Sequence, residues 1–190
     1  HTAHRFSASG VWEIPYGRGR RFGANSARVV NGVLGGWQLS SWMVLRTGVP
    51  LTFGVLGDLL NTGGGYTQVP NRIKEPTLPR SERTRSRFFD TTAFSRPDLY
   101  QIGNAGRNIL IGPGNRNLDL TIAKEFPVSE SKRFQFRAEF FNIFNRVNLG
   151  SSETTGGAND PDNTVTSVTF GRIRSAGAAR EMQFALKFLW

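Results

Sequence analysis

The sequence predicts an all-β protein, an antiparallel up-and-down meander, from three observations. Apolar and polar residues alternate in several windows of ten residues, which is the period of a strand with two unlike faces. The 190 residues include 22 Gly, 9 Pro and 15 Phe, with no long block of Ala, Leu, Glu and Lys that would favour a helical bundle. A hydrophobic content of 38% and an aromatic content of 12% are too high for a disordered chain.

The first two strands are expected near residues 4–15 and 36–54. The apolar phase of the first contains Phe6, Ala8, Trp12 and Ile14. That of the second contains Trp37, Leu39, Met43 and Leu45, although Trp42 and Val44 fall in the opposite phase. Residues 15–36 form a long connection, in which the arginines of "GRGRR" at 17–21 are interpreted as solvated turn residues in preference to a phosphate site.

The next two strands are expected near 116–126 and 132–144. Leu118, Leu120, Ile122 and Phe126 alternate with Asn117, Asp119, Thr121 and Glu125, and the following strand repeats the alternation with Phe134, Phe136, Ala138 and Phe140. The short connection "PVSES" at 127–131 predicts a hairpin. Because Phe136, Phe140 and Phe144 also fit a helical spacing, a helix over 133–144 stays open as an alternative.

The last strand is expected at 181–190, where Met182, Phe184, Leu186, Phe188 and Trp190 form one apolar stripe. The segments 56–115 and 146–180 are rich in Gly, Asn, Pro and Arg and predict two long loops, the second with one short strand in "TVTSVTF". Loops of this length are uncommon in compact domains unless they are functional or mobile.

The alternation alone does not distinguish a soluble sheet from a transmembrane barrel, but three further features favour the barrel. The strands are about as long as the 9 to 11 residues that span a bilayer when tilted. Short and long connections alternate, as periplasmic turns and external loops do in outer-membrane barrels. If the C-terminus is periplasmic, the large aromatic residues fall near the periplasmic strand ends, as an interfacial girdle requires: Trp12, Tyr16, Trp37, Phe126, Phe134, Phe188 and Trp190.

The segments "GGWQLS", "GNAGRNILIGPGNRNLDLTIAKEF", "RFQFRAEFFNIFN" and the terminal "FALKFLW" resemble the C-terminal end of the barrel of Oar-like TonB-dependent outer-membrane receptors. The resemblance implies a parent barrel of about 22 strands around a plug, with this chain as the C-terminal barrel segment over residues 1–190. The plug and the motif that engages TonB would precede the chain. A start at His1 instead of Met fits this expectation of a fragment.

The resemblance also implies a role for the last strand, since a terminal stripe that ends in an aromatic residue is similar to the signal read by the barrel-assembly machinery. The corresponding residues here are Phe184, Leu186, Phe188 and Trp190. A terminal Phe is the commoner choice, so Trp190 departs from the usual form, and it could equally be a girdle residue facing lipid.

The charged residues of the strands are predicted to face the barrel lumen as cross-strand ion pairs: Asp119, Glu125, Arg133, Arg137 and Glu139. Catalytic chemistry is not expected, because the histidines are confined to His1 and His4 and no nucleophile elbow occurs. There are no cysteines. The segment "NDPDN" at 159–163 is interpreted as a turn in preference to a calcium site. We therefore predict no enzyme activity, no cofactor and no metal.

A net charge of +10 raises the question of an anionic partner. The "RSERTRSR" segment offers Arg80, Arg83, Arg85 and Arg87 as candidate contacts to an anion from an outer loop. The expected partners are outer-membrane lipid, the assembly machinery, TonB through the missing N-terminal part, and an unknown extracellular ligand, but no nucleic acid. Two alternatives stay open: a surface or adhesion barrel that transports nothing, and a soluble basic β-protein that binds nucleic acid.

Overall fold

The computed structural model describes residues 2–63, 68–150 and 160–190, so parts of both predicted long loops, 64–67 and 151–159, lie outside it. The chain forms two compact units. The sheet unit consists of Phe6–Leu45, Arg116–Arg146 and Ala178–Trp190. The loop unit consists of His1–Arg5, Arg46–Asn115 and Val147–Gly177.

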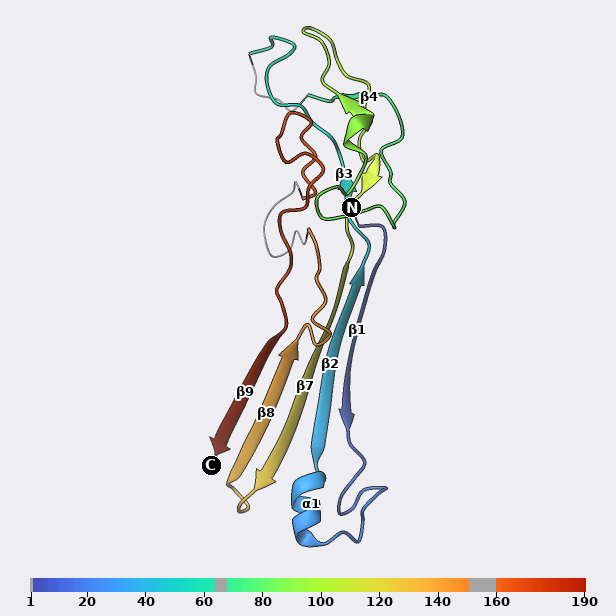
Figure 1. Cartoon of the computed structure of the whole chain (residues 1–190). Helices are drawn as coiled ribbons and strands as arrows, with labels where there is room; N and C mark the ends of the chain where they lie inside the picture. The colour runs from blue at the N-terminus through green and yellow to red at the C-terminus, as the bar shows by residue number, and fades with distance from the viewer. Residues whose placement is uncertain (1, 64–67, 151–159) are drawn as a thin grey trace. The chain divides into compact units, whose positions relative to one another are not determined.

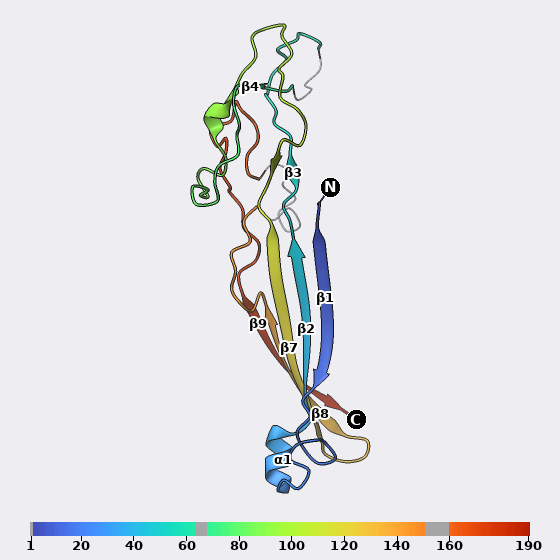
Figure 2. The ribbon, with the colours of Figure 1, turned by 90° about the vertical axis from the view of Figure 1, so that its right-hand side faces the viewer.

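The sheet unit contains one antiparallel sheet with the strand order β1-β2-β7-β8-β9 (Figure 1). Its strands are β1 (Arg5–Glu13), β2 (Trp37–Arg46), β7 (Asn115–Pro127), β8 (Arg133–Phe141) and β9 (Glu181–Leu189). The described residues of the sheet unit form no second sheet, and the turned view shows the strands in a single twisted layer (Figure 2). The predicted all-β antiparallel fold class is confirmed.

The predicted hairpin at the C-terminal end of β7 is also confirmed. β7 and β8 pair from Leu120–Phe140 to Pro127–Arg133, and the Val128 amide donates to the Lys132 carbonyl in the turn. β9 continues the ladder, with Phe134 opposite Phe188 and Phe140 opposite Met182. The alternative helix over 133–144 is wrong, because β8 pairs on both sides and Phe144 lies beyond its end.

The second strand is shorter than the predicted 36–54. β2 ends at Arg46, and a separate β3 (Pro50–Leu51) pairs with β6 (Leu110–Ile111). The chain changes partner at Gly48, where a Cβ atom would collide with the carbonyl group of Gly112. Only glycine permits this approach of two backbones, so the strand divides there.

The connection between β1 and β2 folds around a short helix, α1 (Arg28–Leu34), which the sequence analysis did not anticipate. The Asn31 side chain accepts a hydrogen bond from the Arg18 amide at 2.7 Å and so ties the helix to the preceding turn. The described part of the chain contains no helix of the length and hydropathy needed to cross a membrane.

The loop unit has its own hydrophobic core in place of the two open loops that the sequence predicted. β4 (Asn71–Arg72) pairs with β5 (Phe94–Ser95), which follows the 3-10 helix η1 (Thr91–Ala93). The core is mainly phenylalanine and aliphatic: Leu51, Phe53, Phe88, Phe89, Ala93, Phe94, Ala105, Leu110 and Ile173. Phe53 stacks on Phe94 at 4.1 Å between ring centroids.

The second long connection closes this core. Phe170 packs edge-on against Phe89 at 5.1 Å, and the Phe88 amide donates to the Gly171 carbonyl. The short strand expected in "TVTSVTF" is wrong, because the Ser167 and Phe170 amides turn back to the Thr164 and Ser167 carbonyls. These turns place Phe170 against the phenylalanine core.

Candidate functional site: an apolar sheet face and a groove in the loop unit

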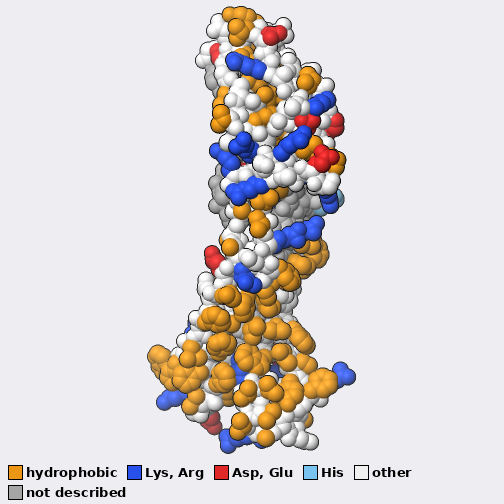
Figure 3. Space-filling model, in the orientation of Figure 1, with side chains coloured by type: hydrophobic (Ala, Val, Ile, Leu, Met, Phe, Trp, Pro, Cys, Tyr) orange, Lys and Arg blue, Asp and Glu red, His pale blue; other side chains and the backbone are white. Residues whose placement is uncertain are grey.

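One face of the sheet is apolar and exposed. By register, the apolar phases of β7, β8 and β9 share this face, with Phe136 opposite Lys124 and Leu186. Phe184 and Leu186 are 66% and 68% exposed, which is far more than isolated surface residues would explain. Figure 3 shows hydrophobic side chains gathered over the strands. This is the face that a barrel presents to acyl chains.

Aromatic residues form a row at one end of this face. Phe126, Phe134 and Phe188 lie directly opposite one another on β7, β8 and β9, so the predicted common level is confirmed for these three. The rings of Phe134 and Phe188 are 4.9 Å apart, and Trp37 meets Phe136 edge-on at 6.1 Å. Such a row has the composition of an interfacial girdle.

The terminal residues that the sequence analysis singled out lie on the edge strand β9 or just past it. Phe184, Leu186 and Phe188 pair opposite Ala138, Phe136 and Phe134. Trp190 follows the strand, stacks on Phe188 at 5.8 Å and is 85% exposed. Their side chains are accessible to lipid or to a partner protein, and their recognition by the assembly machinery stays a prediction.

The charged residues predicted for the lumen lie on the opposite, polar face, but their pairing differs in part from the prediction. Arg133 and Glu125 form the expected cross-strand contact at 3.5 Å. Arg137 pairs with Glu139 along the same strand at 2.7 Å. Asp119 instead accepts hydrogen bonds from the Asn142 amide and the Asn117 side chain.

The different role of Asp119 follows from its position. Its partner Asn142 comes directly after β8, where the ladder ends and a backbone amide would otherwise be unpaired. Asn142 is itself buried and bonds to the carbonyl groups of Arg146 and Ala178. Asp119 therefore secures the strand end, and the lumen-facing role of the five residues stays a prediction.

Lys124 is a charged residue on the apolar face, and the sequence analysis passed over it. Only 3% of it is exposed. Its Nζ donates to the Val33 carbonyl of α1 at 2.8 Å and lies about 5 Å from the ring centroids of Trp37 and Phe126. The available signal was a lysine in the apolar phase of an otherwise alternating strand.

The four loop arginines do not form one anion site. Arg83 donates to the Leu78 carbonyl at 2.8 Å, and Arg85 donates to the Ile173 and Arg174 carbonyls. Arg87 lies 3.6 Å from Asp90. Three of the four therefore hold the loop unit together, and Arg80 has no partner among the described residues, so its role as an anion contact stays a prediction.

Asp90 is a strongly perturbed carboxyl group of the loop unit. It forms an ion pair with Lys74 at 2.7 Å and accepts hydrogen bonds from the hydroxyl and amide groups of Thr92. The contact with Lys74, followed by that with Thr92, lowers the pKa of Asp90 to about 2. Asp90 stays charged at any ordinary pH and fixes the start of η1.

The carboxylates of "NDPDN" also serve the fold, as far as the described residues show. Asp160 accepts bonds from the Arg174 amide and from Ser175, while Asp162 accepts from Thr164, Ser167 and Thr169. Burial opposes ionisation of Asp162, but the hydroxyl groups outweigh it and lower its pKa. These bonds support the interpretation as a turn; Asn159 lies outside the description, and no described group of three metal-ligating side chains occurs.

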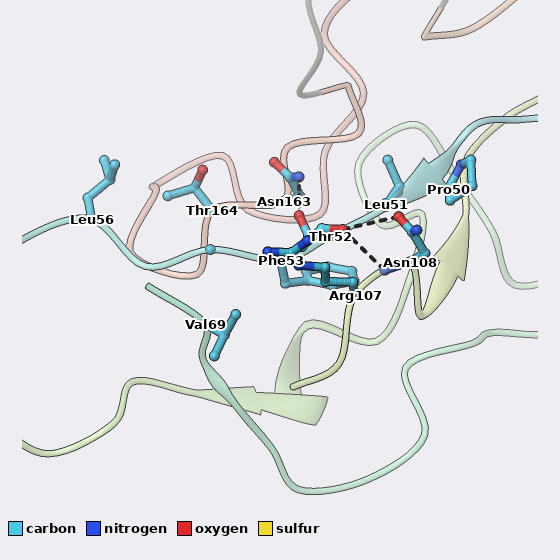
Figure 4. Close-up of a pocket in the computed structure, with 11 residues that line it drawn as sticks. Pro50, Leu51, Thr52, Phe53, Leu56, Val69, Arg107, Asn108, Asn163 and Thr164 are labelled. Atoms are coloured by element: carbon cyan, nitrogen blue, oxygen red, sulfur yellow. Dashed lines mark hydrogen bonds between the residues drawn. The ribbon is translucent and has the colours of Figure 1, made fainter. Parts of the chain in front are cut away.

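A groove of about 660 Å³ crosses the loop unit (Figure 4). Its floor is partly apolar, with Leu51, Phe53 and Val69, and its rim carries the polar groups of Arg107, Asn108 and Asn163. Asn108 and Thr52 bond to each other, and Asn163 donates to the Thr52 carbonyl. The Arg107 side chain has no ion-pair or hydrogen-bond partner among the described residues.

Sequence reasoning missed this groove because its residues come from three separate segments. Arg107 and Asn163 belong to different long connections; Arg107 lies in the segment that carries the family resemblance and Asn163 in the "NDPDN" turn, and neither segment by itself indicates a groove. A concave site with an apolar floor and a few polar groups is typical of ligand binding.

A family model of the outer membrane beta barrel domain matches residues 1–183 of the chain. Comparison with curated proteins and comparison with solved structures both give no match. The matched range includes the loop unit and the sheet unit as far as Gln183, the third residue of β9. The exposed apolar face, the aromatic row and the antiparallel sheet agree with that description, and we conclude that the chain belongs to the outer membrane beta barrel domain family.

Proposed function

We propose that the chain is the C-terminal barrel segment of a TonB-dependent, Oar-like receptor that binds an extracellular ligand and imports it. The observation that carries the proposal is the folded loop unit. Long connections with a phenylalanine core and a groove hold a preformed surface, which costs less entropy on binding than open loops would. The resemblance of the strand segments to Oar-like receptors supports the TonB-dependent class.

In this proposal the end of the sheet that carries the β7–β8 turn is periplasmic, and so is the C-terminus. Short connections mark the periplasmic side in such barrels, and both long connections leave from the other end of the strands. The loop unit would then meet ligand outside the cell. The polar face with Glu125, Arg133 and Arg137 would line the lumen through which the ligand passes once a plug moves.

The chain's own residues give no support for catalysis, so we propose a binding and transport protein and not an enzyme. Membership in an outer-membrane family argues against the soluble nucleic-acid-binding alternative. Arg83, Arg85 and Arg87 also direct donors to carbonyl groups and to Asp90, so these three side chains are engaged within the loop unit and do not form a basic track with aromatic stacking platforms. A surface barrel without transport has the same features and must be distinguished by experiment.

The test compares uptake in cells with and without TonB, using labelled oligosaccharide and oligopeptide mixtures as probes. We expect uptake of one class that requires both the intact receptor and TonB. Arg107→Trp, which places a large ring at the groove and removes a charge that has no partner among the described residues, should abolish uptake, while Ile102→Trp at an exposed position outside the groove should not. Surface binding without any TonB-dependent uptake would support the adhesion alternative and contradict the transport proposal.

A further inference from the structure

We propose that residues 14–36, with α1, form an interfacial segment that lies on the lipid-facing side of the barrel and binds anionic phospholipid of the adjacent leaflet. A long connection at this end of a barrel is otherwise expected to extend into water. The inference follows from the position of Lys124 and from the residues of the segment itself.

Lys124 fixes the side of the sheet on which α1 lies. Its register with Phe136 and Leu186 places it on the apolar face, one row inside the row of Phe126, Phe134 and Phe188. Its Nζ reaches the Val33 carbonyl at the last turn of α1, and the Trp37 indole donates to the same carbonyl at 2.9 Å. The C-terminal turn of α1 therefore covers the lipid-facing side.

This contact also explains how the barrel tolerates the lysine. A lysine exposed to lipid is costly in proportion to its depth in the bilayer. Lys124 instead donates to a carbonyl group at a helix C-terminus, where the helix dipole favours a cation, and lies beside two aromatic rings. The arrangement requires α1 to stay on the sheet.

α1 has the apolar surface of an interfacial segment. Val29, Val30, Val33 and Leu34 are all exposed, with Val29 at 78%, and no buried residue occurs in the helix. The exposed valines continue the apolar surface of the sheet. Their burial in lipid gives α1 the packing that a seven-residue helix lacks by itself.

The polar residues of the segment fit a phosphate-bearing surface. Arg18, Arg20, Arg21 and Arg28 lie between Glu13 and Trp37, and this stretch has no acidic residue. Arg20 pairs with Glu13 at 2.7 Å, and Arg21 lies over the Phe22 ring. The side chains of Arg18 and Arg28 have no partner within the described ranges. Basic residues beside an apolar helix attract anionic headgroups.

The occupant we infer is phospholipid and not lipopolysaccharide, because α1 lies at the same end of the sheet as the short β7–β8 turn (Figures 1 and 2). Short turns mark the periplasmic side of such barrels. This step shares the orientation given under the proposed function, but it does not depend on TonB or on transport.

The experiment uses the intact barrel protein, folded into vesicles, with one thiol in this cysteine-free chain. Val29→Cys and Val33→Cys carry an environment-sensitive fluorophore, and Val168→Cys, which is exposed in the loop unit, is the matched control. We expect quenching by spin-labelled lipid at 29 and 33, and quenching by aqueous iodide at 168. Iodide quenching at all three positions would overturn the proposal.

The lipid class is tested by replacing spin-labelled phosphatidylcholine with spin-labelled phosphatidylglycerol. The anionic lipid should quench more strongly at position 33, and Arg18→Gln with Arg28→Gln should reduce this preference by up to about fivefold for each charge. Equal quenching by both lipids would overturn the headgroup assignment. Quenching that requires lipopolysaccharide would overturn the choice of leaflet. A heat-induced gel shift verifies that each variant is folded.

Discussion

At the scale of single residues, the loop unit depends on carboxylates that are fully engaged inside it. Asp90, Asp160 and Asp162 each bind two or more donors from nearby backbone and hydroxyl groups. These bonds replace regular secondary structure as the means of satisfying backbone amides. Loss of one carboxylate should therefore loosen the loop unit locally, and for Asp90, whose pKa is lowered, the effect should depend on pH.

Asp90→Asn should destabilise the loop unit by about 1.5–3 kcal/mol at pH 6, the usual net value of hydrogen bonds to a charged group. Since the folded-state pKa is lowered from 3.8 to about 2, the contribution is fully present above about pH 4 and is lost as pH falls towards 2. Hydrogen exchange of residues 70–95, corrected for intrinsic rates, measures this. Asp98→Asn, at an exposed position of the same unit, is the control and should leave the exchange of residues 70–95 unchanged. A destabilisation by Asp90→Asn that stays constant down to pH 2 would contradict the role of ionisation.

Gly103→Ala should destabilise the loop unit by about 3 kcal/mol. A Cβ atom at Gly103 would collide with the carbonyl groups of Val69 and Pro70, which are backbone and cannot rotate away. Gly106→Ala is the control, because its Cβ atom would meet only the end of the Ile109 side chain at 3.2 Å. Limited proteolysis should cut the first variant faster and leave the second near wild type; equal rates would show that this approach of the two backbones is not needed.

At the scale of elements, β9 combines two properties that oppose each other in water. It is an edge strand with a free ladder on one side, and most of its apolar side chains are exposed. In a closed barrel the free edge pairs with another strand and the apolar side meets lipid. Substitutions in β9 should therefore affect both the assembly of the barrel and its stability in the membrane.

Phe188→Ser should lower the stability of the folded barrel by about 2 kcal/mol through lost burial in lipid, and should also reduce the fraction assembled in cells. Lys187→Ser, on the opposite face of the same strand, is the matched control. Unfolding in detergent gives the first effect and the heat-modifiable fraction in outer membranes gives the second. If both variants assembled equally well, the last strand would not carry the proposed signal.

The division into two units leads to a second prediction for elements. Phe53→Ala should destabilise the loop unit by about 3–5 kcal/mol, as large-to-small changes in a packed core do, because Phe53 is 1% exposed and touches three other rings. Amide exchange should rise throughout the loop core and stay unchanged in β7 and β8. Equal loss of protection in the strands would mean that the two units unfold together.

At the scale of the whole molecule, the described residues form a sheet whose edge strands are β1 and β9 and whose apolar side chains are largely exposed. Such surfaces are stable in a lipid-embedded, closed barrel and associate in water. We expect the isolated 190-residue chain to aggregate without detergent and to disperse with it. Sedimentation with and without detergent measures this, and a soluble monomer in plain buffer would contradict the membrane-facing role of the apolar sheet.

The strands could be predicted from the sequence because a strand whose two faces meet different environments requires apolar and polar residues to alternate along it. The phase of Phe134, Phe136, Ala138 and Phe140 predicted both β8 and its face, and the short turn predicted its partner. The aromatic row followed in the same way, since chain direction and turn length place strand ends on a common level.

Tertiary structure alone decided the features that join residues distant in sequence. The core around Phe53 and Phe170 and the groove beside Arg107 unite separate connections whose local sequence predicts only loops. The close approach of the Gly48 and Gly112 backbones separates β2 from β3. The hydrogen bond from Lys124 to the Val33 carbonyl accounts for a lysine on the apolar face. The alternation of apolar and polar residues indicates the environment of each strand. Packing between segments distant in sequence produces no such alternation, so that packing becomes visible only in the folded chain.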